Sequence, residues 1–227
     1  MDLDWRYERK FAIEQMSLNE AENIILCNNM LFSEVYYKRQ VNNIYLDSIY
    51  MDAYYNNVEG LSHRKKYRVR WYGDLFSKIR QPVLEVKVKN GIVGSKYKYK
   101  LHEFELGRLF RTKVLKQVFG KSNLPENVNF ELSTVDPTLI NTYSRKYYMS
   151  ANEKYRVTID TGLEYFSVQR GFNNIVSSSP QKGVVIEIKY SLENDENVDR
   201  ITQSFPFRLT RSSKYVQGIS MSTGLNY

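Results

Sequence analysis

Polar and apolar residues alternate strictly along residues 66–73, with a cation at every second position and a bulky apolar residue between. The cations are Lys66, Arg68 and Arg70, and the apolar residues are Tyr67, Val69 and Trp71. Because successive side chains of a β-strand point to opposite faces, this period predicts a strand with one basic face and one core-forming face. For a single strand, the simplest interpretation of the basic face is a solvated outer surface.

Other stretches repeat this alternation, at residues 6–11, 84–89, 156–160 and 184–189. The recurring Glu-x-Lys pairs are Glu8 with Lys10, Glu85 with Lys87, and Glu187 with Lys189. A solvated surface requires charge, but it does not require the same pair on several strands. We therefore expect these faces to line one shared interior. Such an interior would suit a polyanion with a bound metal ion, because cations bind phosphate oxygens and carboxylates bind hard divalent ions.

The rest of the pattern predicts several helices. Ser17 and Glu20 form a capping box, which begins a helix that reaches about residue 29. Apolar residues at helical spacing predict a second helix over 106–119, ended by Gly120, and a last helix covers 212–220. Residues 172–182 are rich in Ser, Asn and Gly and are expected to form a loop.

Further strands are expected over 5–13, 41–46, 139–150 and 154–161, and Asn90-Gly91 predicts a hairpin into a lysine-bearing partner strand. The predicted fold class is α+β, with about eight mostly antiparallel strands closed into a β-barrel, or tunnel, and flanked by helices. The whole chain, residues 1–227, is expected to form one such domain.

Charge and composition narrow the chemistry. The formal net charge is +8 and the pI is near 9.3, which points to an anionic partner such as a phosphorylated molecule, nucleic acid or an anionic membrane surface. The single cysteine, Cys27, is expected to be a small core residue, and its being alone favours a reducing, cytoplasmic location. Two histidines argue against a structural zinc site and a catalytic triad. No signal peptide or transmembrane segment is visible.

A set of short motifs, each weak alone, is specific as an ordered series. The motifs are RYERKF (6–11), IYLD (44–47), RVRWYG (68–73), LEVK (84–87), RVTID (156–160), VIEIK (185–189) and SKY (213–215). In this order the chain resembles the catalytic domain of the vacuolar transporter chaperone (VTC) polyphosphate polymerases, within the triphosphate tunnel metalloenzyme superfamily. The resemblance covers nearly the whole chain. It is to a stand-alone, prokaryotic form, without the phosphate-sensing SPX domain or membrane segment of the larger relatives.

The resemblance implies roles for individual residues. The catalytic phosphate contacts would be Arg68, Arg70, Lys87 and Arg156. Further substrate-binding cations would be Lys10, Lys66, Lys100, Arg145, Lys189, Arg211 and Lys214. Glu187 would match the metal-binding glutamate, with Glu85 and Glu8 as weaker candidates, and the metal would be Mn²⁺ or Mg²⁺.

The function implied by the resemblance is transfer of the terminal phosphate of ATP to a growing polyphosphate chain, with ATP and polyphosphate as partners and no nucleic acid. A rival interpretation is a tunnel triphosphatase, which would activate water instead. Hydrolases of this superfamily favour a Glu-x-Glu-x-Lys signature, and here Arg6 stands at its first position, which favours the polymerase. Two further interpretations are a non-catalytic polyphosphate- or RNA-binding module and a structural domain whose charges simply pair with each other.

Overall fold

The computed structural model describes residues 5–107, 111–168, 175–177 and 180–223. The main strands are β1 (Arg6–Ile13), β2 (Ser33–Asp47), β3 (His63–Tyr72), β5 (Val83–Asn90), β6 (Val93–Lys100), β8 (Asp136–Met149), β9 (Tyr155–Val168) and β11 (Gln181–Ser191). The short strands are β4 (Lys78–Ile79), β7 (Phe104–Glu105) and β10 (Ile175–Ser177). The helices are α1 (Leu18–Leu26), α2 (Asp52–Val58), α3 (Thr112–Lys121), α4 (Glu126–Ser133), the 3-10 helix η1 (Leu192–Asn197), α5 (Val198–Thr202) and α6 (Lys214–Thr223).

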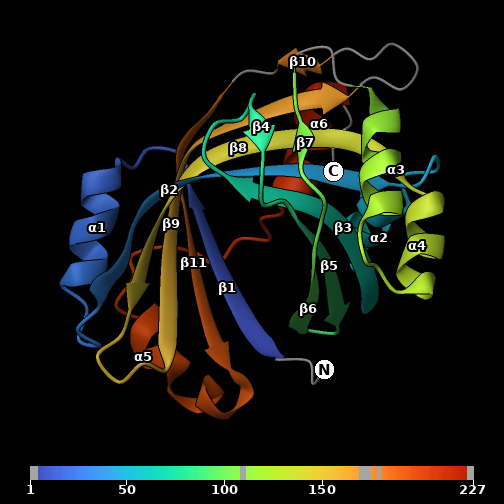
Figure 1. The fold of residues 1–227 in the computed structure, drawn as a ribbon. Coiled ribbons are helices and arrows are strands. Elements are labelled where there is room, and N and C mark those ends of the chain that lie inside the picture. Colours follow the sequence, from blue (N-terminus) through green and yellow to red (C-terminus); the bar gives the residue numbers. More distant parts are fainter. Residues whose placement is uncertain (1–4, 108–110, 169–174, 178–179, 224–227) are drawn as a thin grey trace.

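The main strands form a closed antiparallel ring. They pair in the order β9-β11-β1-β6-β5-β3-β2-β8, and β8 pairs again with β9 to complete the circle. In Figure 1, β9, β11 and β1 form one wall, β3, β5 and β6 form the opposite wall, and β2 and β8 pass between them. The predicted α+β class with mostly antiparallel strands closed on themselves is confirmed.

The pairing between β1 and β6 is the least extensive of the ring, with Arg6 opposite Gly94. Beyond that point a segment near the C-terminus follows β1. The backbone N–H of Thr210 donates to the carbonyl of Lys10 at 2.8 Å, and the N–H of Ala12 donates to the Thr210 hydroxyl at 3.0 Å. This segment therefore satisfies part of an edge that β6 leaves unpaired.

The apolar half of each alternating strand faces outward onto helices. Val69 and Leu84 pack in one cluster with Leu115 of α3 and Leu132 of α4. On the opposite wall, Phe11, Ile186 and Val157 pack in a second cluster with Ala21 and Ile25 of α1 and with Val198 and Ile201 of the α5 turn. Figure 1 shows α1 beside one wall and α3 and α4 beside the other. Because the helices bury the outward face, the charged face is left to the interior.

Helix α6 packs on the inward side of the ring. Its residues Tyr215, Val216 and Ile219 form a third cluster with Leu139 of β8 and Tyr165 of β9. The fit is close at Gly218, where an added Cβ would stand 2.4 Å from Leu139 Cδ2 and 2.5 Å from Tyr165 Cδ1. One end of the interior is therefore filled by apolar side chains, and the charged residues lie in the remainder.

Some predicted boundaries were wrong. β2 begins at Ser33 and not at residue 41, and its first half is exposed. The predicted helix over 106–119 begins at Thr112 and continues through Gly120 to Lys121. Cys27 is exposed at the C-terminal end of α1, so it is not a core residue.

Parts of two predicted elements fall on residues that are not described. They are the helix segment 108–110 and residues 172–174 and 178–179 of the predicted loop, within which β10 and the start of β11 are strands. Among the described residues, no helix combines the length and apolar character needed to cross a membrane.

Candidate functional site

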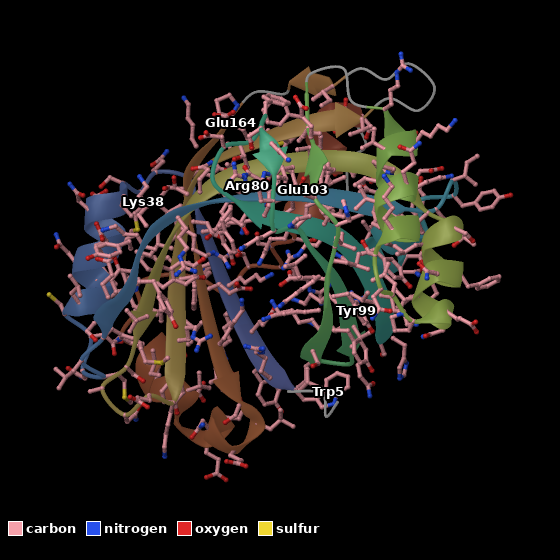
Figure 2. All side chains as sticks on the ribbon, in the orientation of Figure 1. Trp5, Lys38, Arg80, Tyr99, Glu103 and Glu164 are labelled. Carbon is pink, nitrogen blue, oxygen red and sulfur yellow. The ribbon has the colours of Figure 1, made fainter. Side chains whose placement is uncertain are left out.

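Charged side chains from every wall of the ring converge in its interior, and Figure 2 shows that side chains fill the space between the two walls. The inward cations that contact other interior side chains include Lys10, Lys66, Arg68, Arg70, Lys87, Lys96, Arg145, Lys189 and Lys214. The carboxylates paired with these cations are Glu8, Glu85, Asp160 and Glu187, and Asp47 is buried nearby, where it accepts a hydrogen bond from Tyr215. Positive charge therefore exceeds negative charge in an enclosed region, which favours an anionic ligand.

Glu85 of β5 binds the cations of the distinctive RVRWYG motif. Its Oε2 accepts a hydrogen bond from Arg68 Nε at 2.7 Å and lies 2.5 Å from Arg68 Nη2 and 3.5 Å from Arg70 Nη1. Its Oε1 is 2.6 Å from Lys96 Nζ. Arg68 stands directly opposite Glu85 in the β3–β5 register. Arg70 is fixed further by Asn43 Oδ1 at 2.8 Å and by the Tyr143 hydroxyl at 3.2 Å. Glu85 thus holds both arginines in defined positions.

Asp160 of β9 anchors a second group. It receives two hydrogen bonds from Arg145, at 2.5 and 2.6 Å, which form a bidentate pair. Lys214 Nζ, at the start of α6, lies 2.6 Å from Oδ2 of the same carboxylate. Asp160 is fully buried, so its charge is retained only because both cations accompany it.

Glu8 and Glu187 form a third group, from the paired strands β1 and β11. Lys10 Nζ lies between them, 3.9 Å from Glu8 Oε2 and 3.4 Å from Glu187 Oε1. Lys87 approaches Glu8 at 2.6 Å, and Lys189 approaches Glu187 at 2.8 Å. Arg145 reaches Glu187 at 3.9 Å and joins this group to the Asp160 group. β1 and β11 carry two of the three repeated Glu-x-Lys pairs, and β5 carries the third.

Burial and neighbouring charge shift the pKa values of these groups. Burial opposes ionisation of Glu8, but Lys87 and its neighbours lower the pKa of Glu8 to about 2. Burial lowers the pKa of Lys87 to about 8, despite the attraction of Glu8. Burial likewise lowers the pKa of Lys96 to about 7, although Glu85 opposes the shift. Glu8 is therefore held ionised, while Lys87 and Lys96 are close to losing their protons.

Lys66 differs from the other inward lysines in its partners. Its ammonium donates to the Ser213 hydroxyl at 3.0 Å and to the Asn57 side-chain oxygen, both of which are neutral. Burial, with the charges of Lys87 and Lys10, holds the pKa of Lys66 well below its usual range. Asp47 opposes this shift only in part, so a phosphate oxygen placed here would add negative charge beside the ammonium.

Three predicted site residues do not join these groups. Arg156 and Lys100 are exposed on the inward-facing sides of β9 and β6. Arg156 lines a cavity of about 320 Å³ together with Arg6, Lys154 and Lys189. Arg211 is exposed. Burial lowers the pKa of Arg64, and the charge of Arg211 lowers it further, so the two arginines lie near each other.

Sequence reasoning missed several interior residues. Lys96 and Asp160 were noted in strands, but neither was assigned to the site. The neutral residues Asn43, Asn141 and Tyr143 were also missed, because period-two alternation gives no sign of which polar residue is functional. Two buried atoms, Asn141 Nδ2 and Thr158 Oγ1, have no hydrogen-bond partner among the described residues. Both lie on inward faces, where a ligand oxygen would satisfy them.

The carboxylates do not form a ready metal cage. Within the described ranges, no group of three or more His, Cys, Asp or Glu side chains is arranged to hold a metal ion. Glu8 and Glu187 nevertheless lie close enough to share Lys10. Both oxygens of Glu187 contact lysines, at 3.4 and 2.8 Å, and both oxygens of Glu85 contact cations more closely, at 2.5 and 2.6 Å.

Several solved structures share this fold. One is HpAC1 from Hippeastrum, a proposed adenylyl cyclase described as having a dominant triphosphatase activity: TM-score 0.51, 14% identity, covering 98% of this chain and 97% of that one. Others are proposed adenylate cyclases from Vibrio parahaemolyticus (TM-score 0.51, 11% identity, 95% and 99% covered) and Bacillus halodurans (0.52, 12%, 96% and 98%). At these identities the similarity establishes the fold alone.

The family follows from the sequence itself. The model of the VTC domain matches residues 5–223, and the chain therefore belongs to the VTC domain family. The resemblance drawn from the seven motifs is confirmed. No curated protein sequence matches the chain significantly.

Proposed function

We propose that the protein transfers the terminal phosphate of ATP to the end of a polyphosphate chain inside the ring. The observation that carries this proposal is the excess of inward cations over carboxylates in an enclosed interior of a VTC domain. Both substrates are polyanions, and the acceptor oxygen is already an anion. The chemistry therefore requires positioning and charge neutralisation more than a protein nucleophile.

The chain's own residues supply these requirements. Arg68 and Arg70 would each grip phosphate oxygens through a planar guanidinium, and Glu85 would hold both in place before substrate arrives. Lys87, Lys10, Lys189 and Lys214 would act as compact point charges along the phosphate row. Lys66 would add a further cation, and Thr158 would add a hydrogen bond that the described residues leave unfilled. Arg156 and Lys100, at the exposed part of the inward face, would guide the polyphosphate chain.

Mn²⁺ or Mg²⁺ fits part of this site. Glu8 and Glu187 offer carboxylate oxygens from adjacent strands, and Mg²⁺ is commonly held by one or two carboxylates together with substrate phosphates. When bound, the ion would neutralise charge on the phosphate oxygens. Glu85 fits this role less well because three cations, Arg68, Arg70 and Lys96, already bind its oxygens, whereas Glu187 Oε1 meets Lys10 only at 3.4 Å.

The second candidate function is hydrolysis of triphosphates. The structural similarity to HpAC1, which is described as having a dominant triphosphatase activity, supports this candidate. The same cations would bind the substrate, and water would replace the polyphosphate end. We place either activity in the cytoplasm, where ATP is available and a single cysteine needs no oxidising environment.

One incubation separates the two functions. The purified protein is supplied with Mn²⁺ and ATP labelled in its terminal phosphate, and long-chain polyphosphate is resolved from free phosphate. We expect labelled long chains. Label in free phosphate alone would favour the hydrolase, and no turnover with retained ATP binding would favour the binding module.

The role of the arginines is tested in the same assay. Arg68→Ala/Arg70→Ala is expected to reduce turnover by about 100-fold or more, because each charged hydrogen-bonding group contributes about 1.5–3 kcal/mol. Lys65→Ala is the matched control. Lys65 lies on the same strand but pairs with Glu131 on the outer face, so its loss should leave turnover unchanged. Full activity in the double arginine variant would refute the assigned role.

A further inference from the structure

A cluster of aromatic rings lies on the inward face of the ring next to the phosphate-binding cations. We call it the tyrosine rim: Tyr36 of β2, Tyr72 of β3 and Tyr147 of β8, gathered around Arg39. The Arg39 guanidinium carbon is 4.8 Å from the ring centre of Tyr36 and 5.6 Å from those of Tyr72 and Tyr147. The rings of Tyr36 and Tyr147 meet edge to face, with centres 5.6 Å apart.

The position of the rim follows from strand period. Tyr72 is two residues beyond Arg70 on β3, and Tyr147 is two residues beyond Arg145 on β8, so each tyrosine shares the inward face of its arginine. Arg39 is paired with Arg145 in the β2–β8 register. Two residues of strand advance about 6.8 Å. The rim therefore stands one step outward from the cations assigned to the phosphates.

The rim is open to a ligand. The relative exposure of Tyr36 is 49% and that of Tyr72 is 53%, so about half of each residue remains in contact with solvent beside Arg39. Neither tyrosine belongs to the three apolar clusters that hold the fold together. The cavity lined by Arg6, Lys154, Arg156 and Lys189 is different, because cations predominate there. Aromatic faces beside cations match a ligand with a flat ring at one end and phosphates at the other.

We propose that the tyrosine rim is a stacking subsite for the nucleobase of a nucleoside triphosphate. The inference deepens the proposed function, since it assumes that the triphosphate enters the ring beside Arg70 and Arg145. Stacking on tyrosine accepts any base, because every base has a π-face, and larger purines gain more contact than pyrimidines. The rim would thus make the protein bind a nucleoside triphosphate more tightly than inorganic tripolyphosphate, which has no base.

The test compares ligands that share phosphates and differ in the base. Affinities of ATP, CTP and inorganic tripolyphosphate are measured by calorimetry for the wild type and for Tyr36→Ala/Tyr72→Ala. We expect ATP affinity to fall about tenfold or more in the double variant, with a smaller fall for CTP. Tripolyphosphate affinity should stay within about twofold, since the rim contributes no phosphate contact.

Two control variants exclude a general structural effect. Tyr36→Phe/Tyr72→Phe keeps both rings and should retain ATP affinity. Tyr37→Ala removes a neighbouring tyrosine of β2 that is 94% exposed and outside the rim, and it should also leave ATP affinity unchanged. Circular dichroism and the melting temperature confirm that each variant folds.

The outcomes separate this inference from the proposed function. Equal loss of ATP and tripolyphosphate affinity, or no loss of either, would overturn the stacking subsite. Selective loss of ATP affinity would support it, even if the wild type proved unable to make polyphosphate. In that case the proposed polymerase activity would fail and the nucleobase subsite would stand.

Discussion

Single residues in the interior act through the charges that surround them, and Glu187 is the most informative. It is buried on β11 between Lys189, at 2.8 Å, and Lys10, at 3.4 Å. Burial opposes its ionisation, but these lysines hold its pKa well below the usual range, so it is a carboxylate at any working pH. It could therefore hold a divalent cation, or it could serve only to neutralise lysines.

Glu187→Gln separates those two roles. The substitution keeps the volume and loses the charge. If Glu187 holds the metal, ATP should still bind through the cations, while turnover should fall about 10- to 100-fold and recover in part with extra Mn²⁺. Turnover and ATP binding measured across a Mn²⁺ titration provide the test.

Asp160→Asn is the matched control, because Asp160 is bonded to Arg145 and Lys214. It should lose thermal stability and show no recovery with Mn²⁺. Unchanged turnover in Glu187→Gln, with the usual metal requirement, would rule out the metal role.

Lys87 and Lys96 predict how ligand binding depends on pH. Their pKa values are lowered to about 8 and about 7 in the folded protein, from 10.5. A polyanion would raise both values again, so binding above pH 7 must take up protons. We expect tripolyphosphate affinity to fall as the pH rises from about 7 to 9. Calorimetry in buffers of different ionisation enthalpy would measure the protons taken up.

The ligand-free protein should respond in the opposite direction. Because the folded-state pKa of each lysine lies below its unfolded value, the cost of burying the charged form is fully present below pH 7. That cost is relieved as the pH rises through the folded pKa values, so stability from these lysines should increase. Lys96→Arg keeps its charge and should weaken both trends. Tripolyphosphate affinity that is independent of pH, with no proton uptake, would contradict the role of Lys87 and Lys96 in binding the polyanion.

At the scale of elements, the strand faces could be predicted and the partners across the interior could not. Strict alternation in β3, β5 and β11 correctly separated Arg68, Glu85 and Glu187 from the apolar face. Which carboxylate meets which cation depends on the tilt and register of a closed ring, and these are not visible in one strand. Asp160 was missed for this reason, since its partner Lys214 lies on a helix far along the chain.

Boundaries failed where local patterns compete with tertiary contacts. The first half of β2 is exposed and lacks alternating apolar residues, so only its pairing with β8 makes it a strand. α3 passes through Gly120 and ends at Lys121, so the glycine does not mark the end of the helix. An added Cβ at Gly120 would meet nothing within 4 Å. Cys27 was wrongly placed in the core because α1 ends just before it.

The packing of α6 inside the ring predicts opposite effects for two glycine substitutions. Gly218→Ala would place a Cβ 2.4 Å from Leu139 and 2.5 Å from Tyr165, so it should cost about 1–3 kcal/mol of unfolding free energy despite better helix propensity. Gly120→Ala in the open position of α3 should instead stabilise by up to about 1 kcal/mol. Urea denaturation measures both. Equal stability of Gly218→Ala and the wild type would show that α6 is not tightly packed there.

At the scale of the whole molecule, the ring surrounds an excess of positive charge that an anionic ligand would neutralise. The helices cover the outward apolar faces, and α6 fills one end of the interior. What remains is a region with more cations than carboxylates and with two buried polar atoms that have no partner among the described residues. The resemblance to the VTC family predicted this organisation, and the chain's own contacts account for it physically.

The most direct test of this account is an experimental structure of the protein with bound tripolyphosphate. We predict phosphate oxygens within hydrogen-bonding distance of Arg68, Arg70 and Lys66, with Glu85 still holding the two arginines. The Arg68→Ala/Arg70→Ala variant, prepared in the same way, should show little or no phosphate in the interior. Phosphate bound only to the outer surface, with every interior ion pair intact and the ring empty, would contradict the account.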